Sequence, residues 1–307
     1  MIQPVQIIKQ MLDNNSFNKD LLLSVLNSFN DDVAVIPVLL FKKQKVLRTR
    51  PNEDDFFSYI HELSYPPISS ARTDRASLVG KPMFYASAFT KNASKTHAYP
   101  RIVSALETIT LLRSKGATGV KCMTQSVWNV NDNVHLFAFP FSEKYKRACK
   151  EIGMLKAGWK TLLRKSYSKE SIEFFTYIGD LMAETNTSCL YDVTATCVDY
   201  ILAHFNFEGV LYPSVPLEGE GLNICLKPNV VDKKLTFADA VTEIILRNGE
   251  QSTIKILGHA KMISENAFEW IITDEGKAIM LDAGMIDKNK VNNTIVIRSK
   301  ELLNNNI

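Results

Sequence analysis

Apolar residues recur at helical spacing along much of the first two thirds of the chain. Ile7, Ile8 and Met11 show this spacing, and it returns from Leu21 to Leu26 after a polar break. The expected helices lie at residues 1–31, from Phe56 to the prolines at 66 and 67, at 100–113 with Pro100 as its first residue, at 142–165, at 169–185 with Ser168 as its cap, and at 189–205.

Short β-prone segments bounded by turn residues alternate with these helices and then dominate the C-terminal part. The expected strands are KVLRTRP from Lys45, residues 83–86, 120–128 and 134–139 around the turn NVNDN, 209–214 and 222–226. From Leu235 onward the segments TIKILGHAKMI, FEWIITD and KAIMLDAG are expected to be strands, with a hairpin at Asp274–Gly276. The order of elements predicts an α+β protein with a helical N-terminal segment at 1–44, a central domain at 45–232 and a β-rich extension at 233–307.

Composition narrows the classes of partner. The 36 Lys and Arg residues exceed the 33 Asp and Glu residues by only 3, so charge gives no strong case for nucleic acid or a membrane as the main partner. The longest apolar run, Val33 to Phe41, is nine residues, whereas a spanning helix needs about 20. The N-terminus lacks the apolar core of a signal peptide, and the five cysteines form no CxxC pair, which favours a reducing, cytoplasmic setting. The histidines show no metal-ligand spacing, so no metal is expected.

Glu107 is the most informative single residue. On a helix over 102–113, a core stripe of Ile102, Leu106, Ile109 and Leu112 places Glu107 at the edge of the apolar face. A carboxylate there is either partly desolvated in a cleft or simply a boundary residue whose stem packs while its head reaches water.

Three further residues could bind a ligand. Arg75 in a loop can present a planar fork to phosphate, and Tyr85 on a strand can offer its ring for stacking. Ser214 ends the strand GVLYPS, where turn residues often supply binding groups. Each also has an ordinary structural interpretation, as a surface arginine, a core tyrosine and a turn serine.

Taken in order, these pieces resemble the RES-domain family, which is named for its Arg, Glu and Ser. The resemblance rests on DRASLVGKPMFYAS, which holds Arg75 and Tyr85, on SALETI, which holds Glu107, and on FEGVLYPSVPLEGEGLNICL, which holds Ser214 and Asn223. Upstream, LRTR with Arg48 and Arg50 resembles the opening of these domains, so the likeness covers about residues 45–232. The chain departs from the family pattern with Asp74 in place of glycine, Ser77 in place of asparagine and an insertion near residues 91–100.

The resemblance implies an ADP-ribosyltransferase-like mixed sheet flanked by helices, and an enzyme that cleaves the bond between nicotinamide and ribose in NAD. Positive charge then builds on the sugar, and a fixed carboxylate such as Glu107 would stabilise it. Arg75 would hold the diphosphate, Tyr85 would line the nicotinamide pocket, and Ser214 would bind the ribose or orient Glu107. Arg48, Arg50 and Asn223 are further candidates for substrate binding. No metal is required, because the nicotinamide ring is cationic in NAD and departs as a neutral molecule.

The family also implies a biological setting and leaves alternatives open. Many RES proteins are toxins that deplete NAD by hydrolysis or phosphorolysis, so inorganic phosphate, a cognate antitoxin and a second copy of the chain are expected partners. Transfer of ADP-ribose to a protein is the alternative within enzymes. A degenerate module that binds NAD or a nucleotide without cleaving it is the alternative from another class.

Overall fold

The computed structural model describes residues 3–52, 56–88, 99–141, 150–184, 189–219, 221–282 and 296–297. Its described strands form one sheet in the order β1-β5-β6-β7-β3-β2-β4-β8-β9-β10-β11. Neighbouring strands are antiparallel except for β5 and β6, which are parallel. The strands are β1 Ile36–Leu40, β2 Lys45–Asn52, β3 Phe84–Ala88, β4 Thr118–Val130, β5 Val134–Ala138, β6 Gly209–Pro213, β7 Leu222–Leu226, β8 Leu235–Asn248, β9 Gln251–Met262, β10 Phe268–Ile272 and β11 Val296–Ile297.

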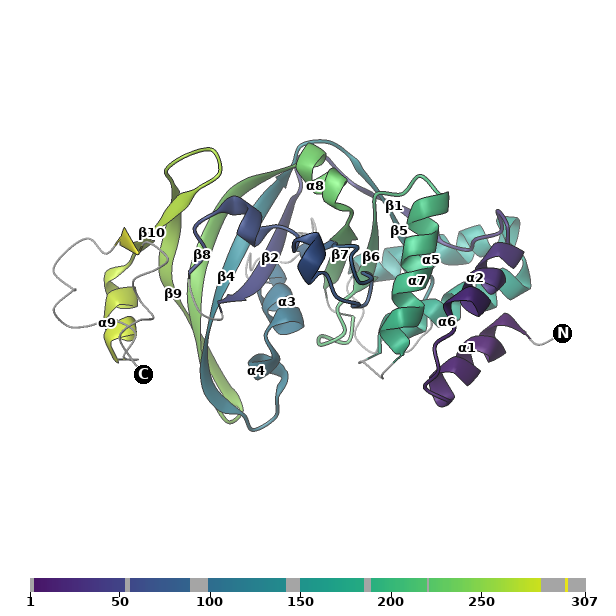
Figure 1. Ribbon diagram of the computed structural model, residues 1–307, viewed down its shortest axis with the longest axis horizontal. Coiled ribbons are helices and arrows are strands. Elements are labelled where there is room, and N and C mark those ends of the chain that lie inside the picture. Colours follow the sequence, from purple (N-terminus) through teal and green to yellow (C-terminus); the bar gives the residue numbers. More distant parts are fainter. Residues whose placement is uncertain are drawn as a thin grey trace.

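Helices flank this sheet, which makes the protein α+β, as the sequence predicts. Five of them, α1 Pro4–Asp13, α2 Lys19–Ser28, α5 Lys150–Ser166, α6 Lys169–Leu181 and α7 Leu190–His204, gather at the end of the sheet that holds β1, β5 and β6 (Figure 1). At the opposite end, α9 Asp274–Asp282 lies beside β9 and β10 (Figure 1). The remaining helical elements are α3 Tyr99–Thr108, α4 Thr110–Arg113, α8 Pro228–Lys234 and the 3-10 turns η1 Ile60–Leu63 and η2 Ile68–Ser70.

Most helices predicted from apolar spacing are present. Two helices occupy residues 1–31, and α6 and α7 match the predicted helices at 169–185 and 189–205 closely. The Ser168 side chain caps α6 by accepting a hydrogen bond of 3.1 Å from the Ser171 backbone amide. The predicted helix at 142–165 is confirmed from Lys150 onward, while residues 142–149 and 185 lie outside the described residues.

Two predicted helices are wrong in part, because tertiary contacts override local spacing. Phe56 and Phe57 are not helical; the Trp270 indole donates to the Phe57 carbonyl at 2.8 Å and draws this segment along β10. The predicted helix at 100–113 divides at Ile109, which is buried and extended, with φ −97° and ψ 103°. The predicted core stripe of that helix is also wrong at Ile102, which is exposed, while Val103 takes its place in the core.

The two strands predicted on either side of the turn NVNDN are confirmed as β4 and β5; β4 pairs with β2 and β8, and β5 pairs with β1 and β6. Another strand prediction is wrong. Residues 274–282 form the helix α9 rather than a hairpin and a strand. Gly276 makes this helix possible, because a Cβ atom there would lie 2.1 Å from the Leu257 carbonyl oxygen of β9. The Thr273 hydroxyl accepts a hydrogen bond from the Gly276 amide and so caps the first turn.

The C-terminal extension continues the central sheet. β8 pairs with β4 from Leu235 opposite Val130 to Asn248 opposite Thr118. The sheet therefore runs without a break across the boundary that the sequence places at residue 233. Across the part of the chain that the structure describes, no helix has the length and apolar character needed to cross a membrane.

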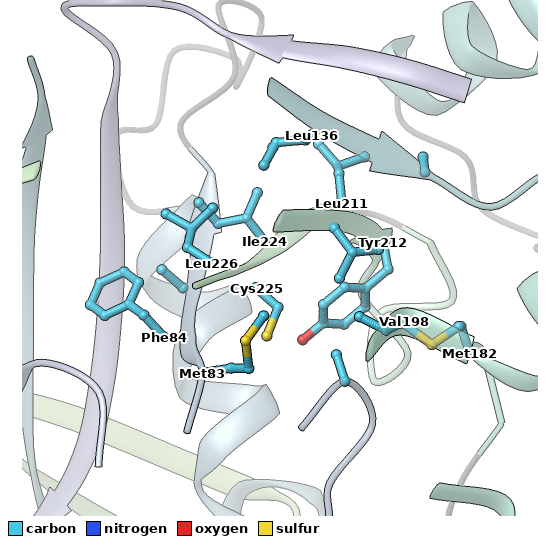
Figure 2. Close-up of a cluster of buried hydrophobic side chains, with 14 of the residues drawn as sticks. Met83, Phe84, Leu136, Met182, Val198, Leu211, Tyr212, Ile224, Cys225 and Leu226 are labelled. Carbon is cyan, nitrogen blue, oxygen red and sulfur yellow. The ribbon is translucent and has the colours of Figure 1, made fainter. Parts of the chain in front are cut away.

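The core beneath the central strands is continuous with helices α6 and α7. Phe84, Ile224 and Leu226 come from the paired strands β3 and β7 and are fully buried (Figure 2). Tyr212 of β6 belongs to the same cluster and lies beside Val198 of α7 (Figure 2). This packing fixes the strands that carry the candidate site.

Candidate functional site

A cavity of about 390 Å³ opens where two neighbouring strands separate. β2 and β3 pair only at Val46 with Ala88 and at Leu47 with Ser87, although both strands continue beyond this point. From Arg48 onward β2 remains paired with β4, while β3 remains paired with β7. The unpaired stretches of the two strands line the cavity. Helix α3 packs against both strands and contributes Glu107 and Ser104 to the wall. The split in the sheet therefore creates the site.

Glu107 is held in this wall by one oxygen. Its Oε1 atom accepts hydrogen bonds from Ser214 Oγ at 2.8 Å, the Val215 backbone amide at 3.1 Å and Asn223 Nδ2 at 2.8 Å. Among the described residues, the second oxygen, Oε2, receives no hydrogen bond, and Glu107 lines the cavity. The half-buried carboxylate is thus fixed in orientation, and the structure brings together three residues of the predicted site.

The hairpin of β6 and β7 brings the donors to Glu107. The Ser214 amide donates to the Gly221 carbonyl at 3.0 Å, which closes the hairpin loop, and Asn223 lies opposite Tyr212 in the register. On its other side Asn223 pairs with Ser87, whose hydroxyl donates to Asn223 Oδ1 at 2.8 Å. This bond orients the amide group of Asn223, so its NH₂ group points at Glu107.

Gly221 allows α3 to approach the hairpin. Its φ of +113° lies outside the range of ordinary L-residues, and a Cβ atom there would come within 2.5 Å of Val103 Cγ2. Val103 lies one helical turn before Glu107 on α3. A glycine at 221 therefore sets the distance between Glu107 and its donors.

Arg75 lines the cavity, but its guanidinium group already donates hydrogen bonds to other residues of the protein. Nη1 donates to the carbonyls of Met182 and Glu184, the latter at 3.0 Å, and Nη2 donates to the Tyr191 hydroxyl at 3.2 Å. The guanidinium carbon also lies 5.2 Å from the centre of the Tyr191 ring. Arg75 thereby ties the loop before β3 to the end of α6 and the start of α7.

Arg48 and Arg50 project from β2 at the split. Arg48 Nη1 donates to the Tyr85 carbonyl of β3 at 2.8 Å, in place of a bond between the strands, and Arg50 Nη1 donates to the Glu62 carbonyl of η1. Burial, together with the neighbouring charge of Arg50, lowers the pKa of Arg48 to about 10. A negatively charged ligand would stabilise the charged form of Arg48, because its opposite charge offsets both the burial of the guanidinium and the repulsion from Arg50.

Tyr85 lines the cavity with its ring while its hydroxyl is bonded elsewhere. The hydroxyl accepts from the Ala76 amide at 3.0 Å and donates to Ser77 Oγ at 3.1 Å. Burial raises the pKa of Tyr85 well above its ordinary value, so the phenol stays neutral. The ring is therefore a fixed, uncharged surface.

Sequence reasoning missed ten of the sixteen residues that line this cavity, among them Ser87, Tyr212, Asp74, Tyr191 and Arg113. Ser87 and Tyr212 lie inside the quoted motifs, so their proximity to Asn223 and Ser214 could have identified them. Asp74 was noted only as a departure from the family pattern. The two others, Tyr191 and Arg113, carry no signal in the sequence and reach the cavity only through the packing of α7 and α4.

The charge of the lining favours an anionic ligand. Four arginines and two carboxylates face the cavity; they are Arg48, Arg50, Arg75, Arg113, Asp74 and Glu107. In the described ranges no group of three or more His, Cys, Asp or Glu side chains could hold a metal ion. The arrangement combines one fixed carboxylate with an excess of guanidinium groups and three tyrosine rings.

Comparisons with known family models and curated proteins identify no relative of this chain. No protein-family model matches the sequence, and no curated protein matches it. The resemblance to RES domains therefore rests on the motifs quoted above.

Proposed function

We propose that the protein consumes NAD by cleaving the bond between nicotinamide and ribose. The observation that carries this proposal is the hydrogen bonding of Glu107, whose Oε1 is held by Ser214, Val215 and Asn223. Glu107 lines a cavity of about 390 Å³, a volume in the range of small-molecule sites. A carboxylate held in this way stabilises positive charge as it develops on the ribose, without reorganising during the reaction.

The rest of the cavity suits the other parts of NAD. Arg48 and Arg50 line the cavity, and in this proposal their charges neutralise the diphosphate, which binds arginine through charge-assisted hydrogen bonds. Arg75 adds its charge to the same wall, although its Nη atoms are directed to the chain. The rings of Tyr85 and Tyr191 offer faces for the nicotinamide or adenine rings.

Ser214 and Asn223 act on Glu107 in this proposal. Each donates to the carboxylate at 2.8 Å, and each is buried in the β6–β7 hairpin. Their donors fix the direction of Oε2 and balance the charge of a half-buried carboxylate. The acceptor of ADP-ribose is water or phosphate, and the biological effect is depletion of NAD by a toxin or defence effector that an antitoxin restrains.

The test compares wild-type protein with Glu107→Gln. Purified protein is incubated with NAD, with and without inorganic phosphate, and nicotinamide and the ribose product are followed by chromatography. Glutamine keeps the shape of the side chain but removes the charge, so we expect nicotinamide release to fall by about a thousandfold. Glu265→Gln, an exposed change outside this cavity, is the matched control and should keep the wild-type rate.

Each result has a defined meaning. Release by the wild type and the control, but not by Glu107→Gln, supports the proposal. NAD that binds but is not cleaved, even when lysate is added, supports a binding module instead. Label from NAD that appears on protein supports transfer to a side chain. Equal release by wild type and Glu107→Gln removes Glu107 from the chemistry.

A further inference from the structure

The cavity lining contains a second carboxylate, Asp74, from a different segment of the chain. Asp74 lies in the loop before β3, where a narrow turn holds it: its amide donates to the Ser77 carbonyl at 2.9 Å, and the Ser77 amide donates back at 3.3 Å. Its Oδ1 atom accepts the Arg75 amide at 2.7 Å. Within the described part of the chain, Oδ2 has no hydrogen-bond donor. Like Glu107, Asp74 lines the cavity and has one carboxylate oxygen that accepts hydrogen bonding from the chain.

Asp74 and Glu107 line the same cavity, from the loop before β3 and from α3. Tyr191 and Tyr212 both line it, and the negative charges of both Glu107 and Asp74 help to raise the pKa of each phenol, in addition to burial. Both charges therefore act on the same two phenols of this lining.

Cleavage of NAD by water requires two functions that one carboxylate cannot serve at once. The group that stabilises the ribose cation must remain ionised through the transition state. The attacking water must also lose a proton as its oxygen bonds to carbon, and that proton needs an acceptor. Glycosidases solve the same problem with two carboxylates.

We infer that Asp74 removes the proton from the attacking water, which makes water the acceptor of ADP-ribose in this protein. The inference rests on the proposed function. The bond between ribose C1′ and the nicotinamide nitrogen breaks, and its electron pair leaves with nicotinamide as a neutral molecule. The water oxygen bonds to C1′, and one water proton passes to Asp74 Oδ2 and then to solvent. The products are ADP-ribose, nicotinamide and one proton.

The role of Asp74 also separates water from phosphate as acceptor. Inorganic phosphate at neutral pH carries ionised oxygens and needs no base to attack. A carboxylate beside the attacking group gives phosphate no assistance and repels it, whereas it activates water.

The test separates attack by water from attack by a nucleophile that has no proton to lose. Wild type and Asp74→Asn are incubated with NAD in phosphate-free buffer, with and without 3-acetylpyridine, whose ring nitrogen can replace nicotinamide. Hydrolysis is measured as ADP-ribose, and exchange as the acetylpyridine analogue of NAD. We expect Asp74→Asn to lose hydrolysis by about a hundredfold, the usual effect of removing a general base, and to keep exchange near the wild-type rate.

Asp239→Asn is the matched control, because Asp239 accepts the amide of the next residue, Ala240, at 2.8 Å, as Asp74 does from Arg75, and lies outside this cavity. It should alter neither reaction. Equal losses of hydrolysis and exchange in Asp74→Asn, or no loss of either, would overturn the role of Asp74. A wild type that releases no nicotinamide in any condition would instead overturn the proposed function itself. Thermal melting of each variant shows whether it is folded.

Discussion

Asn223 Nδ2 donates a hydrogen bond of 2.8 Å to Glu107 Oε1, although the two residues are 116 positions apart in the chain. The bond joins the helix α3 to the strand β7 at the point where the sheet splits. Ser87 fixes the other end of the same amide through Asn223 Oδ1. The direction of the donor is therefore set from a third element, β3, and the carboxylate has one preferred orientation.

Asn223→Asp should turn this attraction into a repulsion, while the side chain at position 223 keeps its shape. Asp keeps the acceptor for Ser87 but places a carboxylate oxygen against Glu107 Oε1, and two carboxylates at hydrogen-bond distance cannot both stay ionised. We expect kcat for nicotinamide release to fall about a hundredfold at neutral pH, as when one fixed donor is lost from a charged site.

Asn248→Asp serves as the control for this substitution, since Asn248 is exposed at the end of β8. It should keep both the rate and the melting temperature. A rate for Asn223→Asp within a few-fold of wild type would mean that the orientation of Glu107 does not depend on Asn223.

The helices were predictable from sequence where they depend on local spacing and caps. The prediction at α6 needed only the apolar stripe and Ser168, whose hydroxyl accepts the Ser171 amide. The fold class followed from the order of such elements. The predicted hairpin and strand at 274–284 were wrong where α9 forms, because nothing in the local sequence shows that Gly276 must fit against the Leu257 carbonyl.

Strand pairing was not predictable, because it depends on contacts far apart in sequence. β4 and β5 flank a plausible hairpin turn, yet β4 finds longer partners in β2 and β8. A strand of 13 residues is stabilised better by two long neighbours than by a strand of five.

The candidate site was predictable as a set of residues but not as a set of contacts. Glu107, Ser214 and Asn223 meet as the motifs suggest. Arg75 lines the cavity too, but its bonds to Met182 and Tyr191 come from the packing of α6 and α7, which no motif describes.

Gly221→Ala should be costly for both stability and activity. The residue would have to keep a φ of +113°, and its new methyl group would lie 2.5 Å from Val103 Cγ2. We expect a loss of about 3 kcal/mol in the free energy of unfolding, measured with urea, from backbone strain and overpacking together. Nicotinamide release should fall as well, because α3 must move away from the hairpin.

Gly80→Ala separates the two causes of that loss. Gly80 also has a positive φ, +73°, but a Cβ atom there would meet nothing within 4 Å. Only the backbone strain remains for Gly80→Ala, so we expect a loss of about 1 kcal/mol in the free energy of unfolding and an unchanged rate of nicotinamide release. Equal losses in the free energy of unfolding for the two substitutions would show that the contact with Val103 does not contribute to the loss in Gly221→Ala.

Glu243 links the C-terminal strands to α3 and makes stability depend on pH. Its Oε1 accepts from Arg101 Nη2 of α3, and its buried Oε2 has no partner in the described residues. Burial raises the pKa of Glu243 despite the nearby guanidinium of Arg101. A carboxyl whose pKa is higher in the folded state contributes most at low pH, and this contribution is lost as the pH rises through the folded-state pKa.

Glu243→Gln removes this dependence, because glutamine stays neutral and can still accept a hydrogen bond from Arg101. Relative to wild type, the variant should therefore gain stability between about pH 4 and about pH 7.5, as measured by urea unfolding at both values. Glu250→Gln, an exposed change on the turn between β8 and β9, should show no such trend. The opposite trend for Glu243→Gln would mean that attraction to Arg101 outweighs the cost of burying the charge, in which case the ion pair, rather than packing, fixes α3 against β8.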